Sequence, residues 1–334
     1  MTPAPAIGPG SGRLEPLRAG EMMRASMNAV TLDHRALEAY LPHRGVNLMP
    51  DQVELSADRK ISKSTTVVPS DDQRGRGILG RSGDGRSVWS EPFIAELMAL
   101  TGVPLLHERL APKGNVAVFS MISRVVVPVL PDLAGKLLGR AEITRDRGDF
   151  TVFRTQAEGV QGVCLEAEVM SGVARMEDIS GAAIRPFAGP LPGDPVDPAW
   201  FAYKAPAMRF VDTVVLADPA SGKAVCAYRY PEDHPFVAGH FPSAALMMGV
   251  TQWQAVADAA WAARAKLGLT GSVVASGRLV RPDGAEVVDV RELVLVPDAA
   301  GLPRIASTKR IAFREPVRPG DGLLAEVTVS VHAG

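Results

Sequence analysis

The same order of sequence signals occurs twice in this chain, once on each side of a proline-rich segment at residues 185–195. Each occurrence begins with a β-like stretch, continues through a loop into an apolar helical run, and ends in several stretches where apolar and polar residues alternate. Such alternation is typical of strands with one buried face. The repeated order therefore predicts two domains of one architecture, each with a helix packed against an antiparallel sheet.

The proline-rich segment predicts the boundary between the two domains. Proline fixes φ and lacks a backbone donor, so repeated prolines favour an extended spacer. The Pro- and Gly-rich N-terminus lacks the apolar run of a signal peptide and is interpreted as a loose tail. The predicted division is a flexible tail at 1–25, a first domain at 26–183, a linker at 184–200 and a second domain at 201–334.

Periodicity places the expected elements and makes the fold class α+β. Apolar runs predict helices that include residues 91–99 in the first half and residues 249–266 in the second. Alternation predicts strands in both halves. They are expected at 52–55, 116–127, 137–144, 150–158 and 162–170, and at 209–216, 272–280, 286–296, 304–311 and 323–332.

Composition limits the function classes. The formal net charge is −1, so no basic field favours nucleic acid. Cys164 and Cys226 lack metal-ligand spacing and form no disulfide framework, which favours a reducing cytosol. The longest apolar helical stretch, at 246–264, is interrupted by polar residues and predicts no membrane span. We expect a cytoplasmic globular protein with no metal or redox cofactor.

The second half carries a motif around one histidine. Gly-His-Phe-Pro at residues 239–242, with the histidine at His240, precedes Met-Met-Gly-Val at 247–250, where the helix starts. This segment resembles the active-site segment of the FabA/FabZ-type hot-dog 3-hydroxyacyl-thioester dehydratases. That family reads Gly-His-Phe-Pro-Gly and then Pro-Gly-Val, and has a catalytic Glu or Asp fourteen positions after the His. Here that position holds Gln254, whose amide cannot exchange a proton as a carboxyl does.

The first half carries the complementary residue. Leu-Pro-His-Arg at 41–44 and the helix at 91–99 resemble motifs of the same family and place Glu96 at the acid position. Fourteen residues earlier, Ser82 stands where the family has its His. In such dimers the two catalytic residues come from different subunits. The resemblance, which covers about residues 38–334, therefore implies a double hot-dog: a fused pseudo-dimer with two antiparallel sheets, each wrapped around a central helix. It would hold one complete site and a silent Ser82–Gln254 counterpart.

The resemblance implies a role for each site residue. His240 would remove the C2 proton, because an imidazole titrates near neutrality. Glu96 would protonate the leaving 3-hydroxyl, and burial on an apolar helix face would keep its carboxyl protonated. The backbone N–H of Gly249, at the helix start, would bind the thioester carbonyl. The expected reaction is dehydration of a 3-hydroxyacyl thioester to a 2-enoyl thioester in fatty-acid or polyketide-like biosynthesis, with acyl carrier protein favoured over CoA as carrier.

Two other functions remain open. The same pocket suits a hot-dog thioesterase or double-bond isomerase. The presence of Ser82 and Gln254 at the family's His and acid positions also fits a silent acyl-binding partner of a synthase. Exposed sheet edges suit further homo-oligomerisation. The remaining motifs are given structural interpretations: His43 and His234 as fold residues, Gln254 as a satisfied core amide, Trp253 and Trp261 as core, and the Arg/Gly-rich loop at 74–81 as a solvated loop rather than a carrier-binding one.

Overall fold

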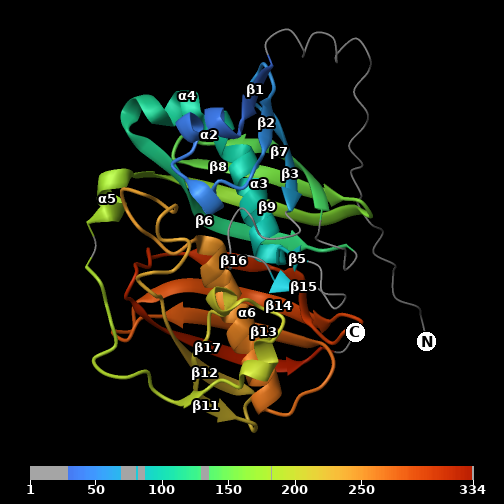
Figure 1. Ribbon diagram of the computed structural model, residues 1–334, viewed down its shortest axis with the longest axis vertical. Coiled ribbons are helices and arrows are strands. Elements are labelled where there is room, and N and C mark those ends of the chain that lie inside the picture. Colours follow the sequence, from blue (N-terminus) through green and yellow to red (C-terminus); the bar gives the residue numbers. More distant parts are fainter. Residues whose placement is uncertain (1–28, 69–79, 82–86, 129–134, 182, 333–334) are drawn as a thin grey trace, which may run out of the picture.

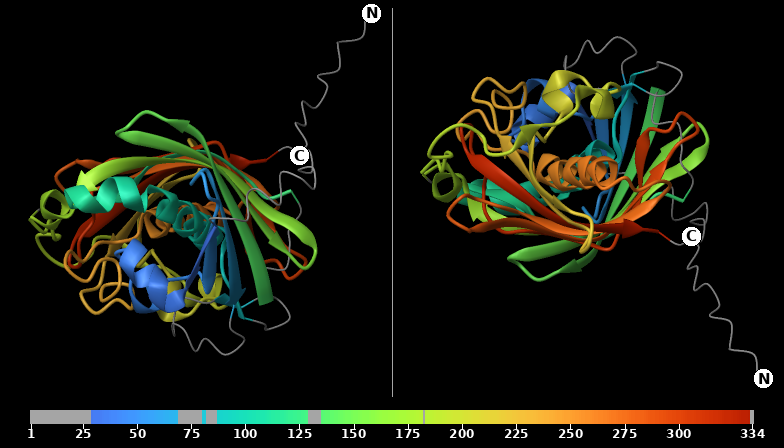
Figure 2. Two further views of the ribbon diagram at one scale, coloured as in Figure 1. Left: turned by 90° about the horizontal axis from the view of Figure 1, so that it is seen from above. Right: turned by 90° about the horizontal axis from the view of Figure 1, so that it is seen from below.

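The computed structural model describes residues 29–68, 80–81, 87–128, 135–181 and 183–332. Two curved antiparallel sets of strands each wrap around one long helix (Figure 1). A helix enclosed by an antiparallel sheet is the hot-dog arrangement expected from the sequence. Seen along the long axis, α3 and α6 lie inside the curvature of their strands (Figure 2).

The first half contains most of the short helices. Its elements are β1 (Val30–Asp33), α2 (His34–Tyr40), η2 (Gly45–Asn47), β2 (Gln52–Leu55), β3 (Ile61–Val68), β4 (Gly80–Arg81), β5 (Ser87–Val88), α3 (Glu91–Gly102), η3 (Val103–Leu106), α4 (His107–Leu110), η4 (Ala111–Lys113), β6 (Asn115–Val126), β7 (Gly135–Asp146), β8 (Phe150–Gly159), β9 (Gly162–Arg175) and α5 (Met176–Ser180), where η marks a 3-10 helix.

The second half repeats the order of strands, loop, long helix and strands. Its elements are β10 (Asp194–Pro195), η5 (Pro198–Phe201), η6 (Pro206–Met208), β11 (Thr213–Asp218), β12 (Lys223–Arg229), α6 (Gly249–Lys266), β13 (Val273–Val280), β14 (Glu286–Pro297), β15 (Pro303–Thr308), β16 (Arg310–Phe313) and β17 (Gly322–Val331).

The strands of both halves join into one continuous sheet. Its order is β1-β2-β3-β7-β8-β9-β6-β15-β14-β13-β17-β12-β11-β10, and β16 pairs with both β14 and β6. The junction is β6, which pairs antiparallel with β15 and β16 of the second half; Ile122 lies opposite Ile311. Both isoleucines are fully buried, so the junction is part of the core.

The two long helices are buried on nearly every face. In α3 every residue except Ala99 is buried, and α6 is buried from Val250 to Ala263. A helix surrounded by apolar side chains in this way belongs inside a core. Trp253 and Trp261 lie on α6 within that core, as expected from the sequence. None of the helices in the described ranges is both long and apolar enough to span a bilayer.

The expected elements differ from the observed ones at a few places. The helix predicted at 249–266 coincides with α6, and that at 91–99 continues to Gly102. The strand predicted at 209–216 begins only at Thr213, because the chain leaves η6 just before it. The strand predicted at 304–311 is broken at Lys309, opposite a part of β14 where Glu292 has a φ of 49°. Strand β12 was not predicted.

The end of the predicted linker takes part in the second sheet. Asp194 and Pro195 form β10, which pairs with β11. The backbone N–H of Val196 also donates to the carbonyl of Asp212. The chain therefore enters the second sheet before the predicted boundary at residue 201.

We expect Ile311→Ala to lower the free energy of unfolding by about 2–5 kcal/mol, because it leaves a cavity at a fully buried position. Urea denaturation followed by circular dichroism measures this change. The matched control is Val331→Ala at the end of β17, where the side chain is 57% exposed, and a change within about 0.5 kcal/mol is expected. Equal effects of the two substitutions would show that the junction contributes no special stability.

Candidate active site

His240 is held in the loop that leads into α6. Its backbone N–H donates to the carbonyl of Phe236, and its carbonyl accepts from the N–H of Leu246. The side-chain Nδ1 lies 3.1 Å from the carbonyl oxygen of Leu246. A carbonyl only accepts hydrogen bonds, so Nδ1 carries the proton and Nε2 keeps its lone pair. Burial lowers the pKa of His240 to about 4, which leaves the imidazole neutral at pH 7.

Glu96 lies in the middle of α3 and is 2% exposed. Burial raises the pKa of its carboxyl from the ordinary value of 4.5 to about 8, because the charged form loses its hydration. Its Oε2 has no hydrogen-bond partner within the described residues. The side chain is therefore protonated at neutral pH and able to donate a proton.

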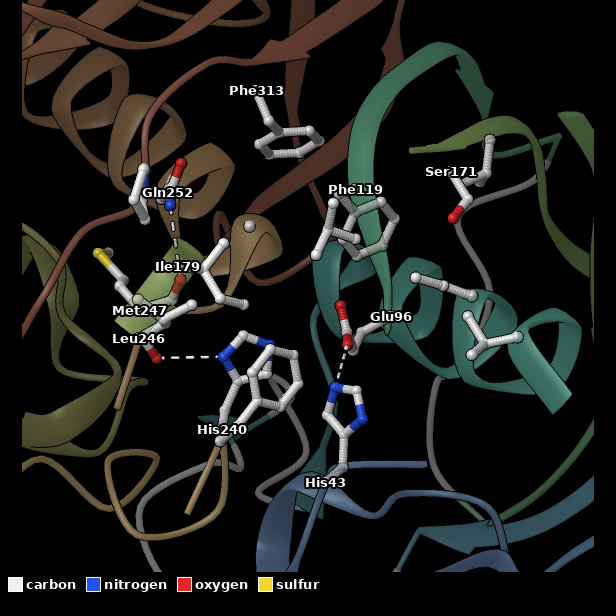
Figure 3. Close-up of a pocket in the computed structure, with 18 of the residues that line it drawn as sticks. His43, Glu96, Phe119, Ser171, Ile179, His240, Leu246, Met247, Gln252 and Phe313 are labelled. Atoms are coloured by element: carbon white, nitrogen blue, oxygen red, sulfur yellow. Dashed lines mark hydrogen bonds and ion pairs between the residues drawn. The ribbon is translucent and has the colours of Figure 1, made fainter. Parts of the chain in front are cut away.

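His43 lies next to both of these residues, although we expected it to serve only the fold. Its Nε2 is 3.7 Å from Oε1 of Glu96, and its ring centroid is 5.0 Å from that of His240 (Figure 3). Burial is the main cause that holds the pKa of His43 well below its usual value. The expectation was wrong in this respect: the Leu-Pro-His-Arg motif supplies a side chain of the cavity wall, and that motif was the only sequence signal for it.

A close backbone contact brings His43 and His240 together. The N–H of Arg44, next to His43, donates to the carbonyl of Gly239, next to His240, at 3.0 Å. A Cβ atom on Gly239 would lie 2.2 Å from the carbonyl oxygen of Arg44 and 2.5 Å from Oδ1 of Asn47. Such distances are shorter than any real contact, so this approach requires glycine at position 239.

His240, Glu96 and Gly249 line a single cavity of about 210 Å³. Gly249 is the first residue of α6, and the N–H at this position has no partner within the helix. A Cβ on Gly249 would lie 3.1 Å from Phe313 and 3.3 Å from Phe119. The walls are mainly apolar and come from both halves, including Ala99, Leu100, Val103, Phe153, Val169, Leu246 and Met247. The sequence-predicted site residues thus meet in one apolar space.

The position in α6 that corresponds to Glu96 in α3 belongs to a series of hydrogen-bonded side chains. Gln254 is the sixth residue of α6, as Glu96 is of α3. Its Oε1 accepts from the hydroxyl of Ser90 at 2.9 Å, and its Nε2 donates to Asp258 at 2.8 Å. Gln254 is therefore a satisfied core amide, as predicted. Ser82 and most of the Arg/Gly-rich loop lie outside the described residues.

Two ion pairs lie near Gln254, and we call Gln254 and these pairs the counterpart region. Glu91 is the first residue of α3, where α6 has Gly249, and its carboxylate is paired with Arg304 at 2.5 Å. Lys204 pairs with Asp258, also at 2.5 Å. A buried carboxylate at a helix start leaves little room for an acyl carbonyl at the same place. The region is suited to joining the halves rather than to holding an apolar ligand.

His234 shows the contrast with a structural histidine. Its Nε2 lies 2.8 Å from the carbonyl oxygen of Ala207, and its ring packs against Tyr230 and Phe236. It is buried but does not line the cavity. The structure agrees with the interpretation of His234 as a fold residue.

No protein-family model and no curated protein matches the chain. Among solved structures, the dehydratase heterocomplex ApeI:P from Xenorhabdus doucetiae is 18% identical, with a TM-score of 0.34, over 43% of this chain and 93% of its own. The fluoroacetyl-CoA thioesterase FlK is 17% identical, with a TM-score of 0.30, over 36% and 88%. A hot-dog-like protein from Thermanaerovibrio acidaminovorans is 18% identical, with a TM-score of 0.28, over 36% and 84%.

The raised pKa of Glu96 makes a prediction about stability. Between pH 4.5 and 8 the carboxyl is protonated in the folded chain and ionised in the unfolded chain. The unfolded state then binds fewer protons, so the contribution of this group is full below pH 4.5 and is lost as pH rises to about 8. Glu96→Gln removes the titration, and the wild type should lose stability relative to it over this window.

Urea denaturation of the wild type and Glu96→Gln at several pH values measures the difference. The comparison cancels the titration of His240, which both proteins contain. A difference in midpoint that is constant from pH 4.5 to 8 would contradict the raised pKa, whereas above pH 8 a constant difference is expected.

Proposed function

We propose that the chain dehydrates a 3-hydroxyacyl thioester to a 2-enoyl thioester at one composite site between two fused hot-dog units. The observation that supports this is the convergence of a neutral imidazole from one half and a protonated carboxyl from the other upon one apolar cavity. Proton-transfer catalysis at neutral pH requires an acid that stays protonated and a base that stays unprotonated. A raised pKa for the acid and a lowered pKa for the base meet this requirement.

In the proposed reaction, Nε2 of His240 takes the C2 proton of the acyl chain. The Gly249 N–H at the start of α6 donates to the thioester carbonyl oxygen and stabilises the enolate-like charge. The C3–O bond then breaks, the electron pair of the former C2–H bond forms the C2=C3 double bond, and the Glu96 proton joins the departing hydroxyl to form water. Because burial weakens His240 as a base, much of the barrier must be lowered by the oxyanion donor.

The site also bears on the kind of substrate. Its apolar walls suit a hydrocarbon chain, and the charged residues Arg314 and Glu315 border the same cavity. We infer an acyl thioester whose carrier is acyl carrier protein rather than CoA, used in the cytoplasm for fatty-acid or polyketide-like biosynthesis. The preference for a protein carrier rests on the sequence resemblance alone.

The direct test is mass spectrometry of a panel of 3-hydroxyacyl thioesters, on acyl carrier protein and on CoA, incubated with the purified protein. The wild type is expected to remove water from at least one of them. His240→Ala and Glu96→Gln should each lower the rate by about 10²-fold or more, because each removes a proton-transfer group. The control is Gln254→Ala, whose amide belongs to the counterpart region and should leave the rate per folded molecule unchanged.

Three other outcomes would change the proposal. Dehydration that survives in Glu96→Gln would remove the composite site, and loss of activity in Gln254→Ala would place the reaction at the counterpart. Binding of acyl thioesters without turnover would favour the silent acyl-binding function.

The pH dependence distinguishes dehydration from thioester hydrolysis. Dehydration needs neutral His240 and protonated Glu96, so kcat/KM should be flat from about pH 4 to about pH 8 and fall on either side. A thioesterase that used Glu96 to activate water would need the carboxylate, and its rate would rise toward pH 8. Release of free thiol with such a rising profile would support the thioesterase and contradict the dehydratase.

A further inference from the structure

Three buried side chains direct polar atoms toward one small space in the cavity. His43, Glu96 and His240 each offer one donor or acceptor atom, and these three atoms lie within 4.8 Å of one another. Some point is therefore no farther than about 2.8 Å from each of them, which is the length of a hydrogen bond to oxygen. The three residues come from separate segments: the loop after α2, the helix α3 and the loop before α6 (Figure 3).

The spacing suits an oxygen atom better than a metal ion. Two imidazoles and a carboxylate are a chemically suitable set for zinc, but zinc holds such ligands at about 2.0–2.2 Å. Two atoms separated by the full 4.8 Å would have to move closer together, because two such bonds span at most about 4.4 Å. A hydroxyl or water oxygen fits the present positions, and a buried site with several polar groups is where an ordered water is expected.

We propose that His43 is a third catalytic side chain, which holds the leaving oxygen of the substrate between itself, Glu96 and His240. This inference rests on the proposed dehydration and adds a residue to it. His43 is buried, its Nε2 is the ring nitrogen nearest Glu96, and its Nδ1 has no hydrogen-bond partner within the described residues. Nε2 is 3.7 Å from Glu96, which is longer than a hydrogen bond, so with the proton on Nδ1 the lone pair of Nε2 is left for a ligand.

Each hydrogen bond of the bound oxygen has a direction. The 3-hydroxyl donates its O–H to the lone pair of His43 Nε2, which turns an oxygen lone pair toward the protonated Glu96. When the C3–O bond breaks, the Glu96 proton completes a water molecule at the same point. His240 is then an imidazolium and Glu96 a carboxylate. The water accepts the proton of His240 and gives one of its own to Glu96, which restores both residues.

A backbone hydrogen bond and an aromatic contact restrict the position of the His43 side chain. Its neighbour Arg44 is bonded through the backbone to Gly239, and the Phe241 ring lies edge-on to the imidazole, with centroids 4.9 Å apart. These contacts fix the imidazole of His43 relative to that of His240, because each of the two hydrogen-bonded residues is the chain neighbour of one histidine. Burial keeps His43 in the neutral form that accepts a hydrogen bond.

The test compares two leaving groups on the same acyl thioester. A 3-hydroxyl needs protonation and orientation to leave, whereas a 3-chloro group leaves as chloride without a proton. His43→Leu is expected to lower the elimination of water by about 10- to 100-fold and to leave chloride elimination within about twofold. His43→Gln, which keeps a hydrogen-bonding group, should retain more dehydration than His43→Leu. The rate without enzyme is subtracted for both substrates.

Two control variants separate chemistry from folding. His240→Ala should lose both eliminations, because both need the C2 proton to be removed. His234→Gln changes a buried histidine outside the cavity and should alter thermal stability without altering the ratio of the two rates. A fall of both eliminations by the same factor in His43→Leu, or no fall in either, would overturn the role of His43.

Two further results have distinct meanings. Loss of wild-type dehydration after treatment with a chelator, with recovery on adding zinc alone, would overturn the oxygen site in favour of a metal site. A wild type that eliminates neither group would overturn the proposed dehydration, and the role of His43 with it. An active wild type with an unaffected His43→Leu variant would overturn only the role of His43.

Discussion

The contact between the Arg44 N–H and the Gly239 carbonyl determines where the site can form. It joins the two segments that carry His43 and His240, and the absence of a side chain at Gly239 allows it. One backbone hydrogen bond contributes only about 1 kcal/mol, so it cannot hold the halves together alone. The pairing of β6 with the second half and the packing of the two buried helices hold the halves together, and the weak contact then fixes the position of the two loops.

Burial gives the site its chemistry by acting oppositely on two kinds of group. Loss of hydration disfavours the charged form of each, so it raises the pKa of Glu96 and lowers that of His240. Both are consequently neutral at pH 7, one with a proton to give and the other with a lone pair to receive one. The counterpart region differs because its carboxylates, Glu91 and Asp258, have cationic partners.

Much of this arrangement could be predicted from the sequence, since periodicity identifies elements with strong patterns. The helix at 249–266 follows from periodicity, and the meeting of His240 and Glu96 at one cavity follows from what the family resemblance implies. The break at Lys309 could not be predicted, because it depends on the backbone of β14 on another strand. The place of His43 was missed for a similar reason: only the pairing of Arg44 with Gly239, nearly two hundred residues apart, brings it to the cavity.

The two ion pairs of the counterpart region, Glu91 with Arg304 and Asp258 with Lys204, bear on how many acyl groups one molecule could bind under the proposed function. Two like subunits related by symmetry would offer two equal sites, and occupancy of one could influence the other. Here one of the two equivalent places borders the apolar cavity, and the other is occupied by the ion pairs of Glu91 and Asp258. Under the proposed function each molecule would therefore bind one acyl group at a time, and the rate should depend on substrate concentration hyperbolically, without cooperativity.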